Sequence, residues 1–279
     1  MTKSLLVLGA GGYLGRHLIP VLVTQGGFRI TAVSSQANVV AAFRDVCHLV
    51  HPVCLPLEEF PLEQAREHDV VVNLACAGVA HKDDNAIHSL STNLSIAHRI
   101  CQLAVHSRDR LLLHFGSDTE QSQLAVYLNS YQGMSLPAAM VQSEASLYSL
   151  SKVIQSSVIR YCSSKSDFYA HVIMTPNLYG GQDPPRSLVG AMRAALQAGL
   201  PFALRNPTAV KRFIHVNSFS AYVIALLHDL LTRSDFVEGR QRFEVSSADF
   251  VPRTTVAAFA QRQWKLLGGD LEALLLDGP

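Results

Sequence analysis

The sequence carries little excess charge of either sign. Lysine and arginine number 23 and aspartate and glutamate 22 among 279 residues, so the formal net charge is only +1. A protein that holds nucleic acid or an anionic membrane surface needs a basic patch or stripe, and this balance offers none. We therefore expect a small-molecule partner, with no nucleic acid and no membrane.

Cysteines and long apolar runs are also scarce. The five cysteines include no C-x-x-C pair, which favours reduced thiols and a cytoplasmic protein over a disulfide framework. No stretch approaches the roughly 18 uninterrupted apolar residues of a membrane span. The cysteines and histidines of segment 47–54 alternate along a predicted strand and cannot converge on one ion, so we expect no metal.

Hydrophobic residues, by contrast, make up 48% of the chain, enough for a large core. Short apolar runs alternate with longer segments at helical spacing, a pattern typical of βαβ units. We predict an α/β fold, a Rossmann-like doubly wound parallel sheet with a small C-terminal lobe. The predicted strands are Leu5–Leu8, Ile30–Val33, Leu49–Cys54, Val70–Leu74, Leu111–Phe115 and Ala170–Met174, and the predicted helices are Tyr13–Thr24, Ala37–Val46, Ile87–Val105 and Ala145–Ser163.

A glycine-rich segment, Gly9-Ala10-Gly11-Gly12-Tyr13-Leu14-Gly15, follows the first predicted strand and opens the first predicted helix. Glycines permit a tight turn and a close approach of the backbone to a pyrophosphate, and the helix N-terminus offers free N–H groups. The strand before the segment and the helix after it are the context that such a turn requires. The sequence therefore predicts a dinucleotide cofactor.

Tyr148 and Lys152 form a Y-x-x-x-K pair on the last predicted helix. Their spacing puts both side chains on one helix face, where we expect the ammonium to lower the pKa of the phenol from about 10 towards neutral pH. Such a phenol can exchange a proton with a hydroxyl or carbonyl oxygen of a substrate. The alternative is a surface helix on which these two residues have no chemical role.

These two motifs, in this order, resemble those of the short-chain dehydrogenase/reductase superfamily. The glycine spacing G-x-x-G-x-x-G is similar to that of its extended branch, the nucleotide-sugar epimerases, dehydratases and reductases. The segments VVVNLACAG, LLLHFGSDTE, MTPNLYGG and KRFIHVNSFSAYVIALL resemble later motifs of that branch. The resemblance covers about residues 4–230.

The resemblance implies roles for individual residues. It makes Ser117, Tyr148 and Lys152 catalytic: Tyr148 as acid or base at an oxygen of the sugar, Ser117 as hydrogen-bond donor to that oxygen, and Lys152 as the partner of the nicotinamide ribose. The implied cofactor-binding residues are Gly9, Gly12, Tyr13, Leu14, Gly15, Ser34, Ser35, Leu57, Leu74, Ala75, Cys76, Asn93, Tyr148, Lys152 and Pro176, and the implied substrate-binding residues are Asn177, Lys211 and Arg212.

The sequence also departs from the family's pattern. The second predicted strand ends in Val33-Ser34-Ser35 and lacks the acid that binds the adenine ribose of NAD, so NADP(H) is mildly favoured over NAD(H). The candidate partners for its extra phosphate are Arg16, Arg29 and Arg44. The usual Asp after the third strand is replaced by Leu55-Pro56-Leu57, and the segment SYQGMSLPAAM adds a predicted active-site loop before Tyr148.

The resemblance implies an NAD(P)H-dependent oxidoreductase that acts on a nucleotide-diphosphate sugar as a homodimer. We expect a 4-keto sugar reductase, because the substrate lobe is short, the NAD-selecting acid is absent, and Thr119 stands where dehydratases of the family carry the Glu of an Asp-Glu pair. An NAD-dependent nucleotide-sugar epimerase and a non-catalytic, redox-sensing dinucleotide-binding protein remain alternatives. We divide the chain into an NAD(P)-binding domain, 1–176, and a substrate-binding lobe, 177–279, from which about 205–235 return to the core.

Overall fold

The structure is a computed structural model that describes residues 2–37, 43, 48–77, 86–120, 144–233 and 242–276. The chain divides into two compact units. Unit 1 comprises Met1–Thr175 and Ser220–Ser247, and unit 2 comprises Pro176–Phe219 and Ala248–Pro279. Most of the predicted helix Ala37–Val46 and the predicted loop SYQGMSLPAAM lie outside the described residues.

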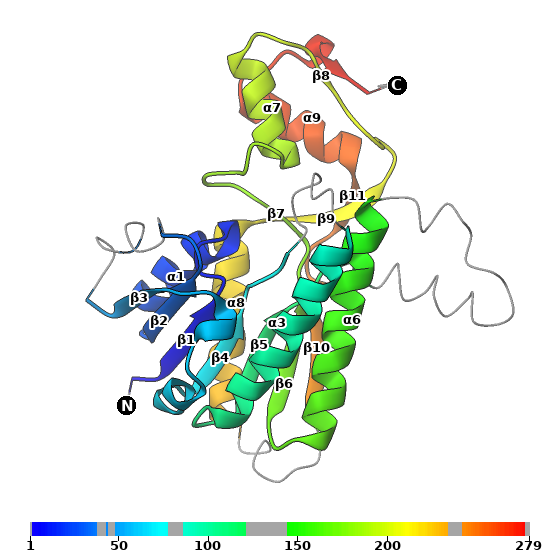
Figure 1. Cartoon of the computed structure of the whole chain (residues 1–279). Coiled ribbons are helices and arrows are strands. Elements are labelled where there is room, and N and C mark those ends of the chain that lie inside the picture. The colour runs from blue at the N-terminus through cyan, green and yellow to red at the C-terminus, as the bar shows by residue number, and fades with distance from the viewer. Residues whose placement is uncertain are drawn as a thin grey trace, which may run out of the picture. The chain divides into compact units, whose positions relative to one another are not determined.

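Unit 1 is built on a seven-stranded sheet with the strand order β10-β6-β5-β4-β1-β2-β3, in which all neighbours are parallel (Figure 1). Four of these strands are buried along their whole length, as expected for a parallel sheet that helices cover on both faces. The predicted Rossmann-like fold is confirmed. The strands are β1 (Ser4–Leu8), β2 (Arg29–Ser34), β3 (Val50–Cys54), β4 (Val70–Asn73), β5 (Leu111–Phe115), β6 (Tyr169–Met174) and β10 (Phe243–Ser247).

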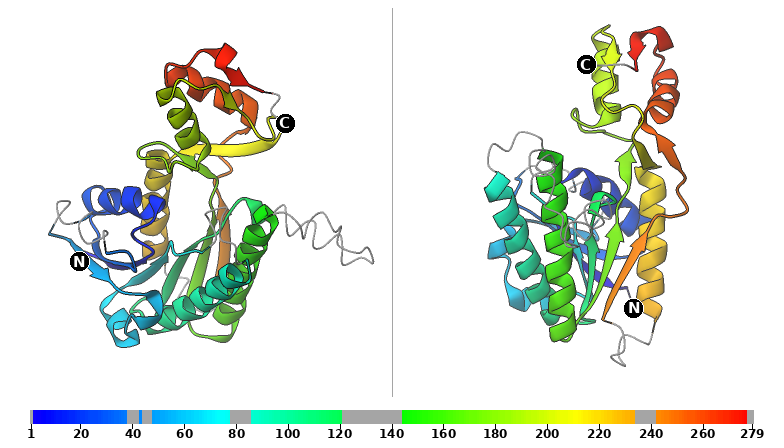
Figure 2. Two further views of the ribbon diagram at one scale, coloured as in Figure 1. Left: turned by 45° about the horizontal axis from the view of Figure 1, so that its top comes forward. Right: turned by 90° about the vertical axis from the view of Figure 1, so that its right-hand side faces the viewer.

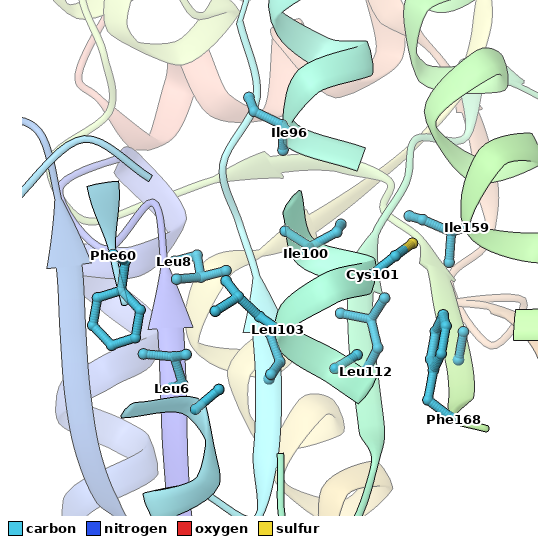
Figure 3. Close-up of a cluster of buried hydrophobic side chains, with 14 of the residues drawn as sticks. Leu6, Leu8, Phe60, Ile96, Ile100, Cys101, Leu103, Leu112, Ile159 and Phe168 are labelled. Atoms are coloured by element: carbon cyan, nitrogen blue, oxygen red, sulfur yellow. The ribbon is translucent and has the colours of Figure 1, made fainter. Parts of the chain in front are cut away.

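Helices cover both faces of this sheet (Figure 2). Helices α3 (Ala86–His106) and α6 (Glu144–Lys165) pack together on one face, and α1 (Tyr13–Thr24) and α8 (Val216–Thr232) lie on the other. Two short 3₁₀ helices, η1 (Leu57–Glu59) and η2 (Leu62–Glu67), connect β3 to β4. Figure 3 shows the core between the sheet and the α3–α6 layer, where Leu6, Leu8 and Leu112 meet Ile100 and Ile159. This core fixes the strand ends and helix faces that carry the candidate site.

Unit 2 has regular structure that the sequence did not predict. Its elements are β7 (Asn177–Tyr179), α7 (Leu188–Gln197), β8 (Phe202–Ala203), β9 (Val210–His215), β11 (Arg253–Thr255), α9 (Val256–Leu266), η3 (Leu271–Ala273) and β12 (Leu274–Leu275). Strands β11, β9 and β7 form one small sheet, and β12 pairs with β8. Glycine- and proline-rich segments connect these elements. The unit has its own core around Met192, Trp264 and Leu274, and the rings of Phe213 and Phe259 stack 3.8 Å apart.

Candidate active site

At two positions of the glycine turn between β1 and α1, Gly9 and Gly15, a side chain would collide with the protein backbone, and at Gly11 it would come within 2.6 Å of the Ser34 hydroxyl. Gly9 has φ +77°, and a Cβ atom there would lie 2.5 Å from the backbone nitrogen of Ala75. A Cβ atom on Gly15 would overlap the carbonyl oxygen of Ala10. A Cβ atom on Gly12, by contrast, would meet only the carbonyl oxygen of Gly9, at 3.3 Å. Packing within the protein therefore explains Gly9 and Gly15 but leaves space in front of Gly12.

The N-terminus of α1 is available to an anion. Gly12 is the residue before the helix, it makes no side-chain cap, and the first turn contains no acidic residue. The first N–H groups of a helix have no partner within the helix and form the positive end of its dipole. Tyr13 and Leu14, both half-buried, occupy this first turn. The turn has the features that a pyrophosphate requires.

A cavity of about 430 Å³ lies in unit 1 against the glycine turn and the carboxyl ends of the strands. The predicted cofactor residues that line it are Gly9, Gly12, Ser34, Ser35, Leu57, Leu74, Ala75 and Cys76. Sequence reasoning missed the lining residues Leu8, Val33, Gln36, Leu55, Pro56, Glu58, Ala77, Thr92 and Ile96. Most of these lie one or two residues beyond a predicted residue, so extending each strand-end segment would have found them. Ligands of open α/β sheets bind at this edge.

The cavity lining contains an acid and, among the described residues, no lysine or arginine. Glu58 from η1 is the acid. Arg29 begins β2, at the end of the strand opposite Ser34, so it lies away from the cavity. Arg16 lies on α1 outside the lining, and Arg44 lies outside the described residues. The phosphate partners proposed from the sequence are therefore not found in the described lining.

Asn93 is buried in α3, and its side chain bonds to protein groups. Its Oδ1 atom accepts the N–H of Ala77 at 2.8 Å, and its Nδ2 atom donates to the carbonyl oxygen of Ala77 at 3.1 Å and to Ser151 Oγ at 2.9 Å. Asn93 thus fixes the segment after β4, which lines the cavity, to α3 and α6. A contact between Asn93 and a cofactor remains a prediction. The same holds for Pro176, which is the first residue of unit 2.

Tyr148 and Lys152 lie one turn apart on α6, and both are held inside unit 1. Lys152 is only 2% exposed, and its Nζ atom donates to the carbonyl oxygen of Phe115 and to Gln155 Oε1, both at 2.8 Å. Tyr148 is hydrogen-bonded to Cys76, which lines the cavity. The phenol is therefore next to a residue of the cavity lining, although Tyr148 itself does not line the cavity, and the lysine joins α6 to the end of β5.

The prediction that Lys152 lowers the pKa of Tyr148 is not supported. The pKa of this phenol is raised above its ordinary value, first by burial and then by Cys76 and by the negative charge of Glu120. The ammonium of Lys152 is directed to Phe115 and Gln155 instead. Tyr148 is consequently held in its protonated form at neutral pH.

Ser117 follows β5 and joins the same group of residues through its backbone. Its hydroxyl pairs with Thr119 Oγ1 at 2.9 Å, and its N–H donates to Glu120 Oε1 at 2.7 Å. Lys152 bonds to Phe115, two residues earlier on the same segment. The loop of Ser117 is therefore tied to the helix that carries Tyr148 and Lys152. Sequence reasoning missed Glu120, although an acid so close to the end of a buried strand was a usable signal.

The three predicted substrate residues lie in unit 2. The Asn177 side chain donates to the carbonyl oxygen of Arg212 at 3.0 Å and so connects β7 to β9. The guanidinium of Arg212, partly buried, forms an ion pair with Asp249 at 2.5 Å. Lys211 is exposed, and no carboxylate of a described residue pairs with it. Lys211 is therefore the better candidate for a free cation, and the substrate contacts of all three remain predictions.

Comparison with known proteins decides the family. A family model described as the NAD dependent epimerase/dehydratase family matches residues 5–236. The chain belongs to this family. The predicted superfamily and the prediction of an NAD(P)-dependent enzyme are confirmed. A comparison of the chain with curated proteins found no significant match.

Solved structures share the fold of this family member. A dTDP-glucose 4,6-dehydratase from Streptomyces venezuelae, with NAD and TYD bound, is 17% identical with a TM-score of 0.73, covering 99% of this chain and 88% of that one. A UDP-glucuronic acid 4-epimerase from Bacillus cereus, with UDP-glucuronic acid and NAD, is 14% identical with a TM-score of 0.74, covering 99% and 87%. A UDP-N-acetylglucosamine 4-epimerase from Methanobrevibacter ruminantium is 14% identical with a TM-score of 0.74, covering 100% and 86%. None of the described helices combines the length and the hydropathy that a membrane-spanning segment needs.

Proposed function

We propose that this protein transfers hydride between a nicotinamide dinucleotide and a nucleotide-activated sugar, and that the reaction is the reduction of a 4-keto sugar. One observation carries the proposal: a continuous series of contacts connects the cavity to the predicted catalytic residues. Cys76 lines the cavity and bonds to Tyr148, Lys152 follows one turn later, and its ammonium bonds to Phe115, two residues before Ser117.

The features of the glycine turn support a dinucleotide in this cavity. The open space at Gly12, the uncapped N-terminus of α1 and the adjoining cavity of about 430 Å³ fit a pyrophosphate with its adenosine. When bound, the nicotinamide would supply the hydride that the protein's own side chains cannot.

The proton chemistry is assigned to Tyr148. Hydride addition to the carbonyl carbon leaves negative charge on its oxygen, and Tyr148 would donate its phenolic proton to that oxygen while Ser117 donates a hydrogen bond. The raised pKa of Tyr148 supports this direction, because a protonated phenol is the acid that reduction needs. Lysine has three N–H donors, of which Lys152 gives two to Phe115 and Gln155, so one would remain for the nicotinamide ribose.

A reductase is favoured over a dehydratase by the residues after Ser117. Dehydratases of the family use an Asp-Glu pair, whereas Asp118 is followed here by Thr119. Glu120 comes one residue later, and both of its carboxylate oxygens accept hydrogen bonds from protein groups, Ser117 N and Ser156 Oγ. This carboxylate is therefore committed to the protein rather than to a substrate.

The epimerase is the second candidate, since structures of similar fold include two UDP-sugar 4-epimerases. An epimerase oxidises first, so it would need Tyr148 as a base, against the direction of the raised pKa. A non-catalytic dinucleotide sensor is the third candidate. It has no need of Ser117, Tyr148 and Lys152 together.

Turnover of purified protein distinguishes the three candidates. NADPH or NADH absorbance is followed with 4-keto-6-deoxy nucleotide sugars, and copurifying nicotinamide is measured. A reductase would consume the reduced cofactor. In that case Tyr148→Phe should lower the activity at least about 100-fold and leave cofactor binding and thermal stability unchanged. Tightly bound NAD without net consumption would favour the epimerase. Cofactor binding without turnover on any sugar nucleotide would overturn both enzymatic candidates.

The proposal also covers which dinucleotide is bound and which unit binds the cofactor and which the substrate. The lack of an acid at Ser34 and Ser35 supports NADP(H), whereas Glu58 in the lining supports NAD(H), because its carboxylate would repel a 2′-phosphate. Titrating the protein with NADPH and NADH decides between them. We further propose that unit 1 binds the cofactor and that unit 2 recognises the diphosphate of the sugar nucleotide through Lys211.

A further inference from the structure

Glu120 is a buried carboxylate that the proposed chemistry does not use. It is only 4% exposed. Its Oε1 atom accepts the N–H of Ser117 at 2.7 Å, and its Oε2 atom accepts the hydroxyl of Ser156 at 2.8 Å. Each oxygen has a donor, which is the bonding pattern of an ionised carboxylate. A charge is seldom buried without a partner. The question is therefore what a buried carboxylate does at this position.

The partner on α6 belongs to a stripe of functional residues. Tyr148, Lys152 and Ser156 are spaced by four residues, so their side chains lie on one face of the helix. Glu120 bonds to the last of the three and holds the backbone of Ser117 with its other oxygen. One side chain therefore links the loop of one predicted catalytic residue to the helix face of the other two.

The residue before this loop leaves room for the carboxylate. A Cβ atom on Gly116 would lie 2.7 Å from Glu120 Oε1, closer than such contacts normally come. Any side chain at Gly116 would push the carboxylate away from Ser117. The local backbone is thus matched to a glutamate in this place.

We propose that Glu120 is a positioning residue for the reaction: its carboxylate fastens the Ser117 loop to the face of α6 that carries Tyr148 and Lys152 and places a negative charge beside that pair. The inference rests on the proposed function for the roles of these three residues. Glu120 itself touches no reacting atom in this scheme.

The charge of Glu120 acts on titratable groups from several elements. Burial raises the pKa of Glu120 above its ordinary value, while Lys152 of α6 and the two hydrogen bonds act in the opposite direction and favour the carboxylate. Glu120 in turn raises the pKa of Tyr148 and that of Cys76 after β4. His114 of β5 is buried and neutral, because burial and Lys152 lower its pKa. Replacing Glu120 by a neutral side chain should therefore lower the pKa of Tyr148.

Two substitutions separate the charge from the hydrogen bonds. Glu120→Gln keeps an acceptor for Ser117 N–H and a donor for Ser156 Oγ but removes the charge. Glu120→Ala removes the charge and both bonds. We expect Glu120→Ala to lower kcat by about 10- to 100-fold with KM changed less than about threefold, because misplaced groups cost rate more than binding. We expect Glu120→Gln to recover most of kcat, with the alkaline limb of the pH profile of kcat moved to lower pH.

The control is Glu63→Gln, which removes an exposed carboxylate from η2 and should leave kcat, KM and the pH profile unchanged. Wild-type kcat and an unmoved pH profile in Glu120→Ala would overturn the proposal. An unmoved pH profile in Glu120→Gln would overturn its electrostatic part. If Glu120→Ala does not fold, Ser156→Ala, which removes one end of the link, is expected to lower kcat to a smaller extent, and a wild-type kcat there would overturn the role of the link.

A measurement without substrate keeps this inference separate from the proposed function. Alkylation of Cys76 by iodoacetamide, followed by peptide mass spectrometry across pH, reports the charge beside Tyr148. Glu120→Gln should move the alkylation profile to lower pH, and exposed Cys54 should alkylate unchanged. If no sugar nucleotide reacts with the wild type, the proposed function fails, while a moved Cys76 profile still supports the charge of Glu120 in the site. An unmoved Cys76 profile contradicts it.

Discussion

Gly12→Ala should weaken dinucleotide binding without unfolding the protein. The new Cβ atom meets only the carbonyl oxygen of Gly9, at 3.3 Å, and Gly12 has φ −69°, which alanine adopts freely. The cost is therefore that of a poorer residue at the start of α1, about 1 kcal/mol or less. Such a change lowers Tm by roughly 2–4 °C.

The effect on binding is larger because the methyl group enters the space in which a pyrophosphate approaches the turn. We expect the Kd for NADH or NADPH to rise at least tenfold, equivalent to about 1.4 kcal/mol. Fluorescence titration of the reduced dinucleotide measures it directly. A dinucleotide at about 100 times Kd stabilises the wild type by about 2.7 kcal/mol, and a tenfold rise in Kd reduces this at the same concentration to about 1.4 kcal/mol, so at least about half of the thermal shift should vanish in the variant.

Gly15→Ala is the matched comparison. Its Cβ atom would overlap the backbone of Ala10, so the turn itself must move, at a cost of about 1–3 kcal/mol. Its Tm should fall further than that of Gly12→Ala. The reasoning is refuted if Gly12→Ala binds the dinucleotide with the wild-type Kd, or if it destabilises the protein as much as Gly15→Ala does.

Three other predictions concern buried charge and cofactor choice. Burial lowers the pKa values of His114 and His171, so the unfolded chain takes up protons below about pH 6.5 that the folded protein does not. The free energy of unfolding should therefore fall as pH drops below about 6.5, by up to about 1.4 kcal/mol per pH unit for each histidine. Urea unfolding at several pH values should show a weaker dependence of this free energy on pH in His171→Gln than in the wild type. Asp69→Asn should cost about 1–3 kcal/mol in the same assay, because this buried carboxylate accepts a backbone N–H and pairs with Arg108. Glu58→Gln should raise the affinity for NADPH relative to NADH by a few-fold in titrations, and an unchanged ratio would exclude Glu58 from cofactor choice.

The sheet of unit 1 was largely predictable because its strands are apolar runs. Runs such as Val70–Asn73 are buried on both faces and stand out without alternation. The strand Phe243–Ser247 was missed because it pairs only with β6, at the edge of the sheet, and carries Glu244 and Ser246 among its apolar residues. In unit 2, four of the five strands have only two or three residues, too short for periodicity to distinguish them from loops, and the six-residue β9 has a single buried residue.

The candidate site was predictable where backbone geometry dictates residue type. Positive φ at Gly9 and the close packing at Gly15 leave a visible glycine spacing. The protonation of Tyr148 was not predictable, because it depends on Cys76, far away in the sequence, and on the burial of both residues. A helical spacing shows that Lys152 shares a face with Tyr148, but it does not show where the ammonium points.

A buried polar layer holds together the elements of unit 1 that carry the proposed reaction centre. Asn93 holds the segment after β4 and bonds to Ser151, Gln155 bonds to Lys152, and its Nε2 atom donates to the carbonyl oxygen of Asn93 at 3.4 Å. Polar networks of this kind cost stability if one member is lost, and when complete they restrict side chains to one arrangement. The layer connects the segment after β4 to α3 and α6, so these elements cannot shift independently. On the proposed function, cofactor and proton chemistry would therefore need no rearrangement of these elements, and the choice of sugar nucleotide would fall to residues outside this layer.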